Sequence, residues 1–300
     1  DFTIDAKSHV RATGLWQFMS GTAKRYGLKN NIYVDERMDF VKSTYAATKY
    51  LNYLHKKFGK WYIAAIAYNC GEGRVIEAIT RSTIDMYVDK YGKKNQHHKK
   101  ISQYRKTIKL YQQKRVKFRE LYKIYKVVKK WDVKPDIYQM LVVQKKISRQ
   151  YIPNESREYI RKIISLAMMN NQNFVTKYDN SHLRNLGLSS AMATVNVKGG
   201  LHMKNIADSI GMKTRDLLKL NKHIKRFIIP TNVKTYAIHI PYSRLSRFTL
   251  NKNSIRPTTY AIHSVKSGEN LSLIGEKYGI PYSLIKKHNR LKSNVLALKS

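Results

Sequence analysis

The segment GLWQFMSGTAKRYGL, residues 14–28, places Trp, Gln and Met directly after a glycine-led turn. A second unusual segment, AIAYNCGEGRV at 65–75, carries Tyr68 and Asn69 inside an apolar run that ends at two glycines. Buried helices rarely hold such a polar pair. One explanation is a helix C-cap at Gly71, with Asn69 capping the last carbonyls. The other is a helix that breaks at a cleft and presents a phenol and a carboxamide to a ligand.

The sequence between these two segments predicts helices. Apolar positions recur at three- and four-residue spacing after Asp35 and stop at Gly59, which indicates one face of an amphipathic helix. A second helix begins near Trp61 and is apolar almost all round, so we expect it to be buried. The predicted buried positions of the first helix are Phe40, Val41, Thr44, Tyr45, Ala47, Thr48, Leu51, Leu54 and Phe58.

The composition supports a packed core in a very basic chain. Hydrophobic residues make up 42%, and 58 Lys and Arg face 19 Asp and Glu, a net charge of +39. Such a field attracts nucleic acid, anionic lipid or an acidic cell-wall polymer, although solvated lysine-rich helix faces explain it equally well. No nucleic-acid-reading motif accompanies the charge. The single cysteine rules out an internal disulfide, and no apolar run approaches the ~18 residues of a membrane span.

Three ordered blocks resemble the catalytic domain of the soluble lytic transglycosylase family: residues 14–28, YVDERMDFVKSTYAATKYL at 33–51, and residues 65–75. The similarity is greatest to the membrane-bound murein transglycosylase D type, in which a lysozyme-like helical domain precedes LysM repeats. The resemblance implies non-hydrolytic cleavage of the β-1,4 bond between N-acetylmuramic acid and N-acetylglucosamine, giving 1,6-anhydromuropeptides. It also implies one glutamic acid whose pKa an apolar pocket raises.

The resemblance places this acid outside the chain. Counting back from Gln17 along the spacing of the family motif E-S-x-F, Phe2 matches its Phe and the acid falls two positions before Asp1. Asp1 occupies the variable position of the motif and Asp5 lies beyond Phe2, so we expect neither to replace it. We therefore expect a fragment that is cut just after its acid and is inactive on peptidoglycan by itself.

Other site residues of the family have counterparts here. The resemblance implies that Ser8 donates a hydrogen bond to the acid or to the acetamido group of the substrate. It implies that Gln17 and Met19 form the cleft floor, and that Tyr68 and Asn69 bond near the acid and the substrate. Without the resemblance, Ser8 reads as an ordinary N-cap or turn serine.

The family motif E-T-R-x-Y-V is echoed by ESREYI at 155–160. The resemblance implies that Glu155 and Tyr159 line the cleft from a helix that closes the domain. A helix-surface glutamate in a capping box, with Asn154 leading, explains Glu155 equally well. Cys70 stands where relatives more often have Ala, and we expect it to pack in the core rather than act as a nucleophile.

About seventy residues separate Ile79 from Tyr151, where relatives carry a short loop. They predict a basic helical insertion at about 85–145, in which Pro135 ends the helix with the aromatic stripe. Its Lys and Arg suit anionic glycan strands or phospholipid headgroups. His97 and His98 have no accompanying carboxylate or cysteine, so no metal site is expected. The stripe expected to pack consists of Ile101, Tyr104, Ile108, Tyr111, Val116, Phe118, Leu121, Tyr122, Tyr125, Val128 and Trp131.

The second half of the chain contains an internal repeat. At an offset of 68, VKGGLHMKNIADSIGMKTRDLLKLN at 197–221 aligns without gaps with VKSGENLSLIGEKYGIPYSLIKKHN at 265–289. Each copy predicts strand, Gly turn, helix, turn and helix, which resembles the βααβ LysM module that binds N-acetylglucosamine-containing glycan. The first copy is degenerate and closes with TYAIHIP, whereas the second lacks that strand and is expected to be truncated.

In LysM modules the glycan lies between the strand–helix turn and the helix–strand turn. The resemblance therefore nominates in the second copy Gly268, Glu269, Asn270, Leu271 and Asn294, and with weaker support Val295 and Leu296. Asn289 ends the second helix of that copy and is expected to fix the following loop.

The sequence thus predicts an α+β, mostly α chain. The expected parts are a lysozyme-like domain at 1–180 with its insertion, a degenerate LysM-like module at 190–245 and a LysM module at 258–300. The expected function is that of a periplasmic lytic transglycosylase acting on peptidoglycan strands, and the alternative is a non-catalytic peptidoglycan-binding protein. No cofactor and no specific nucleic acid are expected. Contact with an anionic membrane surface, and attachment as a lipoprotein, are left open.

Overall fold

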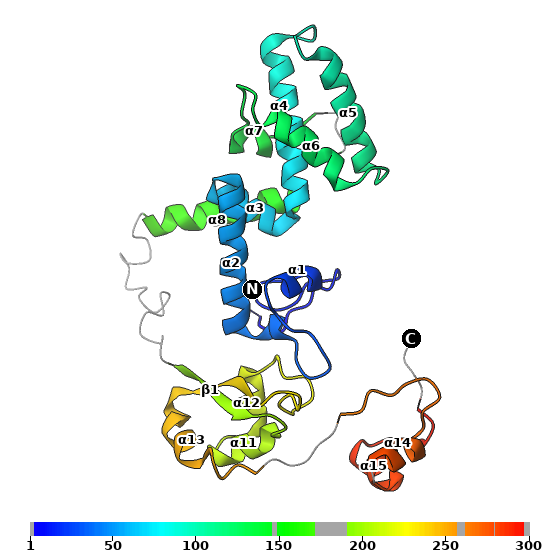
Figure 1. Ribbon diagram of the computed structural model, residues 1–300. Coiled ribbons are helices and arrows are strands. Elements are labelled where there is room, and N and C mark those ends of the chain that lie inside the picture. The colour runs from blue at the N-terminus through cyan, green and yellow to red at the C-terminus, as the bar shows by residue number, and fades with distance from the viewer. Residues whose placement is uncertain (1–2, 146–148, 172–190, 257–261, 279, 297–300) are drawn as a thin grey trace. The chain divides into compact units, whose positions relative to one another are not determined.

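The computed structural model describes residues 3–145, 149–171, 191–256, 262–278 and 280–296. Contacts divide the chain into two units, Asp1–Ala191 and Met192–Ser300, and each is described by itself (Figure 1). The described chain is mostly helical with one small antiparallel sheet, as the sequence predicts. None of the described helices is both long and apolar enough to span a membrane.

The first unit is built around two helices that pack on each other, α2 (Phe40–Phe58) and α3 (Trp61–Cys70). They follow the short helix α1 (Ser20–Arg25) and a 3-10 turn, η1 (Glu36–Met38). Asp39 caps α2 by accepting hydrogen bonds from the Val41 and Lys42 amides. Gly59 ends the helix in the left-handed conformation at φ 76°. Both predicted helices are therefore confirmed.

The buried face of α2 differs from the predicted stripe. The residues that are buried are Ser43, Ala46, Ala47, Tyr50 and Leu54. Val41 and Tyr45 are exposed, and so are Thr44 and Thr48, so the prediction is wrong at these four positions. The physical reason is that the buried face of α2 carries small side chains at Ser43, Ala46 and Ala47, which let neighbouring segments pack closely against the helix.

The apolar run after Trp61 breaks at Gly71, which has φ 90° and separates α3 from α4 (Glu72–Tyr91). The break leaves Tyr68 and Asn69 in the last turn of α3. The core of this unit joins α2 and α3 to α8 (Asn154–Asn171), through buried residues that include Leu54, Ile66 and Ile160.

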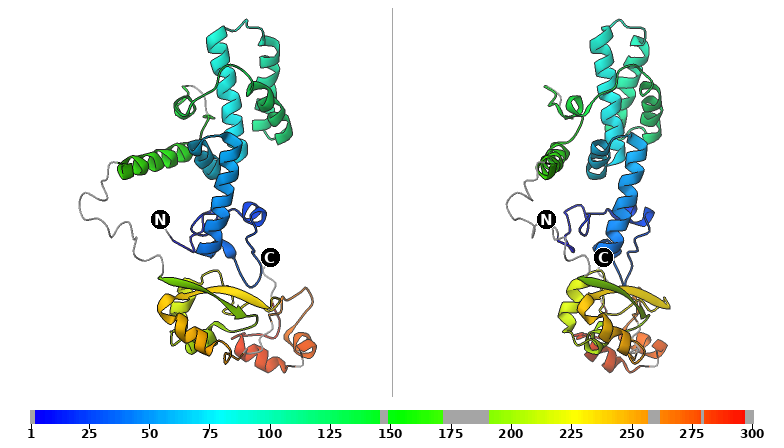
Figure 2. Two further views of the ribbon diagram at one scale, coloured as in Figure 1. Left: turned by 60° about the vertical axis from the view of Figure 1, so that its left-hand side comes forward. Right: turned by 90° about the vertical axis from the view of Figure 1, so that its left-hand side faces the viewer.

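The insertion forms a separate helical layer on α4, with α5 (His98–Gln112) and α6 (Phe118–Val128) beside it (Figure 2). The predicted aromatic stripe is indeed mainly a packing face, shared between these two helices. Helix α6 ends at Val128, however, so Pro135 does not end it; Pro135 instead precedes the short helix α7 (Ile137–Leu141). The buried members of this layer are Ile76, Ile84, Tyr87, Ile101, Ile108, Leu121, Ile124, Tyr125, Val128 and Val133.

The second unit begins with the expected βααβ module. Strands β1 (Met192–Lys198) and β2 (Thr235–Pro241) pair antiparallel, with Val195 opposite Ile238. Between them lie α11 (Met203–Ser209) and α12 (Thr214–Leu220). The turn η2 (Tyr242–Arg244) and helix α13 (Leu245–Asn251) follow, and α13 returns to the module because the Asn251 side chain donates to the Ser209 carbonyl at 2.8 Å.

Asn221 joins the second helix of this module to its closing strand. Its Nδ2 donates to the carbonyl oxygens of Leu217 at 2.9 Å and His239 at 2.7 Å. Its Oδ1 accepts from the His239 amide at 2.8 Å. Asn221 is fully buried, and it is the repeat counterpart of Asn289, whose Nδ2 donates to the Ile285 carbonyl at 2.8 Å.

In the second copy the structure contains α14 (Leu271–Tyr278) and α15 (Tyr282–His288). Among its described residues the expected first strand is not formed, and a single bridge joins Asn270 to Val295. An extended segment forms a ladder only where a second segment offers backbone partners. The expected truncation concerns the end of the chain, where residues 297–300 lie outside the described part.

Candidate active site

The glycine that opens GLWQFM is required by close packing. Gly14 has φ +85°, and a Cβ at this position would lie 1.9 Å from the carbonyl oxygen of Arg37. Arg37 in turn holds the loop, since its Nη1 donates to the carbonyls of Arg11 at 3.1 Å and Phe18 at 3.2 Å. Asp35 neutralises the buried guanidinium at 2.8 Å. Gln17 and Met19 thus lie on a loop that Arg37 holds in place.

Gln17 is exposed and lies at φ +48°, a left-handed conformation that is uncommon outside glycine. Its Nε2 donates to the carbonyl oxygens of Gly14 at 2.7 Å and Ala6 at 3.3 Å. Both N–H groups of the carboxamide are therefore engaged, and the amide oxygen is the group that a ligand can reach. Strained backbone of this kind is concentrated at functional sites.

Tyr68 connects α3 to this loop. Its hydroxyl donates to the Trp16 carbonyl at 2.9 Å, and its ring packs edge-on against Trp16 and Phe18, with centroids 6.3 Å and 6.1 Å away. Burial is the main cause that raises the pKa of Tyr68, and it raises the pKa of neighbouring Tyr50 to about 12. Both phenols are therefore neutral at physiological pH.

Asn69 is held from the other side by α8. The Ser156 hydroxyl, 1% exposed, donates to Asn69 Oδ1 at 2.5 Å, which leaves the Nδ2 hydrogens of Asn69 for a ligand. Sequence reasoning singled out Glu155 and missed Ser156. The signal was present, because the family motif has a hydroxyl residue, Thr, at the position of Ser156.

These side chains surround a pocket of about 220 Å³. It brings together four of the predicted residues, Gln17, Met19, Tyr68 and Asn69, and Met19 is 47% exposed there. The complete lining is Gln17, Phe18, Met19, Thr22, Tyr50, Tyr68, Asn69, Cys70 and Gly71. Burial raises the pKa of the Cys70 thiol, which keeps it protonated and agrees with a packing role.

The other predicted residues lie at the margin or elsewhere. Tyr159 lies near enough to Tyr68 to contribute to the shift of the Tyr68 pKa. Ser8 Oγ accepts a hydrogen bond from the Ala12 amide at 3.0 Å, as in an ordinary turn. Glu155 is exposed and does not line the pocket in the described residues.

No carboxylate lines the pocket among the described residues. Glu72 follows directly but forms an ion pair with Lys57. Glu77 lies further along α4. Burial alone would raise its pKa, but the guanidinium groups of Arg149 and Arg74 hold that pKa below the usual range. The described pocket therefore offers neutral donors and acceptors around a partly apolar floor.

In the second LysM-type copy the two nominated turns lie together. The Leu271 amide donates to the Asn294 carbonyl at 3.2 Å, and Gly268 has φ +84°. Glu269 is used within its own turn, because it accepts from the Lys266 amide and contacts His263 Nε2, both at 2.7 Å. Asn270 Oδ1 accepts from the Leu273 amide at 3.0 Å. Val295, bridged to Asn270, is exposed.

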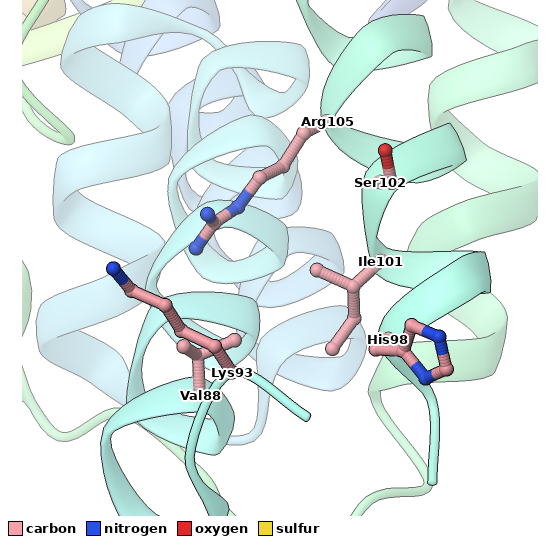
Figure 3. A pocket seen from close by; sticks show the side chains of 6 residues that line it. All are labelled: Val88, Lys93, His98, Ile101, Ser102 and Arg105. Carbon is pink, nitrogen blue, oxygen red and sulfur yellow. The ribbon is translucent and has the colours of Figure 1, made fainter. Parts of the chain in front are cut away.

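A second pocket, of about 290 Å³, lies on the insertion (Figure 3). Lys93, His98 and Arg105 line it together with Ser102 and an apolar floor. The ammonium of Lys93 and the guanidinium of Arg105 point toward the same part of this pocket. Arg105 also pairs with Asp85 at 2.7 Å.

Three stretches of the chain match known domain families. Residues 1–86 match the transglycosylase SLT domain. Residues 191–257 match the LysM-like domain of the lytic transglycosylase MltD, and residues 263–299 match the LysM domain. The chain carries a transglycosylase SLT domain followed by two LysM-type domains.

Three relatives illustrate the similarity. Membrane-bound lytic murein transglycosylase D of Escherichia coli K12, and that of the O6:H1 strain CFT073, are each 24% identical over 98% of this chain. A putative tributyltin chloride resistance protein of Alteromonas sp. strain M-1 is 46% identical over 27% of the chain. The chain spans 55% of the E. coli proteins and 39% of the Alteromonas protein, about half the length of the relatives it matches.

Proposed function

We propose that the SLT domain binds peptidoglycan glycan in the pocket under Gln17 and Asn69, and that it serves non-hydrolytic cleavage between N-acetylmuramic acid and N-acetylglucosamine. The observation that carries the proposal is the pair of fixed carboxamides. Gln17 has its N–H groups engaged and offers an oxygen, whereas Asn69 has its oxygen engaged and offers N–H groups. An acetamido group carries one N–H and one C=O, and two such partners match it.

The reaction needs an acid that the pocket lining does not contain. We propose that it is the Glu that the family motif places two positions before Asp1. It protonates the leaving glycosidic oxygen, and the C6 hydroxyl of the muramic acid then attacks C1 while the carboxylate takes its proton. The products are a 1,6-anhydro sugar and a free 4-hydroxyl. No water is consumed, because the nucleophile belongs to the bound sugar and is positioned by binding.

The described pocket residues orient the sugar and keep the surroundings of the acid free of charge. Tyr50 and Tyr68, both neutral, place no charge beside the acid, and a partly apolar wall keeps a carboxylic acid protonated near neutral pH. Gln17 and Asn69 fix the sugar, and Tyr68 fixes the loop that carries Gln17.

The test is digestion of purified sacculi by the chain preceded by Glu-Ser, compared with the chain preceded by Gln-Ser and with the chain starting at Asp1. We expect anhydromuropeptides only from the Glu-Ser form. Release by all three forms would contradict the proposed acid, and release of reducing-end products would contradict the non-hydrolytic reaction.

The alternative is a peptidoglycan-binding protein without catalysis. The absence of a carboxylate among the described pocket residues favours it for the chain that starts at Asp1. This alternative predicts that all three forms sediment with sacculi and that none releases soluble fragments. A nucleic-acid-binding role instead predicts DNA binding that falls steeply with salt.

We also propose that the LysM-type modules hold the protein on glycan strands in the periplasm. The paired turns at Gly268 and Asn294 support this, because the Leu271–Asn294 hydrogen bond brings them together while Gly268 and Asn270 stay exposed. Truncation after residue 190 is expected to weaken sedimentation with sacculi, and equal sedimentation of the two forms would contradict the proposal.

For the insertion we propose contact with an anionic membrane surface. Its exposed lysines support the proposal. The pocket of Lys93 and Arg105 supports it as well, because its described lining contains no acidic side chain and the Asp85 that pairs with Arg105 lies outside that lining. We expect the chain to sediment with vesicles that contain phosphatidylglycerol and not with pure phosphatidylcholine vesicles. Charge reversal at Lys93, Lys99 and Lys106 should weaken this binding, and an unchanged affinity would contradict it.

A further inference from the structure

A buried carboxylate that the proposed reaction does not use lies one and a half turns beyond the cleft on α4. Glu77 is fully buried and accepts hydrogen bonds from three separate segments. Arg74 Nη1 donates to both of its oxygens at 2.9 and 3.0 Å, and Arg149 donates from Nε at 2.9 Å and from Nη2 at 2.7 Å. Gln112, at the end of α5, donates at 2.7 Å.

Arg81 also contacts Glu77, at 3.4 Å, and together with Arg74 it holds the backbone that leads into α8. Arg81 Nη2 donates to the Arg149 carbonyl at 2.8 Å, and Arg74 Nη2 donates to the Gln150 carbonyl. The next residue, Tyr151, is buried under the Arg81 guanidinium, 5.1 Å from its ring centroid. Its hydroxyl donates to Asp85 at 2.6 Å. Residues 149–151 are therefore fixed to α4 at several points.

Residues 149–151 set the position of the α8 side chains that border the cleft. Helix α8 begins three residues later at Asn154, and its first turn supplies Ser156, the residue that orients Asn69. Tyr159, one turn further, lies near Tyr68. Any displacement of residues 149–151 is carried into α8, because a helix moves as a rigid element.

We propose that Glu77 is a positioning residue of the candidate cleft: by gathering Arg74, Arg81 and Arg149 it fixes the start of α8, and through Ser156 it fixes Asn69. This inference rests on the proposed function. It assigns to Glu77 no contact with the glycan and no proton transfer. Gln112 makes the insertion a participant, since it completes the hydrogen bonds of the Glu77 carboxylate from α5.

Charge explains why a carboxylate is needed at this position. Three guanidinium groups meet here, and Glu77 is the acidic group that all three contact. Replacing it by glutamine keeps the size of the side chain and some hydrogen bonds but leaves like charges facing one another. The half-exposed Arg149 is expected to turn to solvent, which releases the Arg149–Gln150 backbone from α4.

The test compares Glu77→Gln, Glu77→Asp and the matched control Glu120→Gln, whose carboxylate forms an exposed pair with Lys123. Hydrogen exchange is followed at the amides of 149–160 and, as a reference, at buried Leu54 and Ile66 in α2 and α3. The side-chain amide signal of Asn69 in ¹⁵N NMR, assigned with Asn69→Asp, reports its orientation. Affinity for a GlcNAc oligomer is measured in the same samples, with Asn69→Ala to subtract the LysM contribution.

For Glu77→Gln we expect at least tenfold faster exchange at 152–160, a displaced Asn69 signal and at least threefold weaker binding in the cleft, with Leu54 and Ile66 unchanged. Glu77→Asp should recover part of each effect, and Glu120→Gln should behave as wild type. Equal loss of protection in the reference amides would reduce Glu77 to a stabilising role and overturn the proposal, as would an unmoved Asn69 signal. If the wild type binds no oligomer in the cleft, the proposed function fails, while exchange and the Asn69 signal still decide the role of Glu77.

Discussion

Substitution of Gly14 by alanine tests the claim that close packing under the loop builds the cleft floor. The added Cβ meets the Arg37 carbonyl at 1.9 Å in a backbone with φ +85°. A left-handed alanine costs about 1–2 kcal/mol by itself, and overpacking against backbone adds about 1–3 kcal/mol. Gly59→Ala is the matched control, because Gly59 has φ +76° and nothing within 4 Å of its Cβ position.

The two variants should therefore differ by the overpacking contribution alone, about 1–3 kcal/mol. The assay is urea unfolding followed by tryptophan fluorescence, which reports the first unit because Trp16, Trp61 and Trp131 all lie there. Gly14→Ala should also weaken oligosaccharide binding, since Gln17 and Phe18 move with the loop, whereas Gly59→Ala should not. Equal free energies of unfolding for the two variants would refute the packing argument.

Three further predictions concern single contacts. Ser156→Ala should lower oligosaccharide affinity about threefold to tenfold while lowering the free energy of unfolding by only ~1 kcal/mol, because water can satisfy exposed Asn69; Ser156→Thr should restore affinity in the same titration, and failure to do so would argue against the hydroxyl. Asn221→Ala should destabilise the isolated residues 191–257 by about 2–3 kcal/mol in thermal unfolding, since it leaves buried backbone groups unpaired, and a loss below ~0.5 kcal/mol would contradict the role of Asn221. The pKa of Glu77 is lowered in the folded state, so its stabilisation is present above its ordinary value of 4.5 and is lost as pH falls through the lowered value; urea midpoints between pH 6 and pH 3 should fall less steeply for Glu77→Gln than for Glu120→Gln, and parallel curves would exclude this contribution.

Local features of the first unit were predictable because they depend on neighbouring residues. Apolar spacing predicts α2 and α3, and the glycines at 59 and 71 mark their ends. The buried face of α2 was not predictable in the same way. That face uses Ser43, Ala46 and Ala47, which hydrophobicity patterns rank below exposed Val41 and Tyr45.

The long-range contacts of the site could not be predicted from the sequence either. Ser156 meets Asn69 across 87 positions and Arg149 meets Glu77 across 72, and nothing in either segment alone specifies its partner. The resemblance to a family supplied Gln17, Met19, Tyr68 and Asn69 as pocket residues. It could not supply Glu77, whose partner Gln112 lies 35 positions away on α5.

The hairpin of α4 and α5 closes beside the start of α4. Helix α4 carries the chain outward over 20 residues, about 30 Å, and α5 brings it back until Tyr111 lies beside Gly73 and Gln112 reaches Glu77. Because this hairpin closes beside Glu77, the chain leaves α5 close to the start of α4. Evolution, or a protein engineer, can therefore lengthen or shorten α4 and α5 together by whole turns at the far end and present a different outer surface with the same cleft.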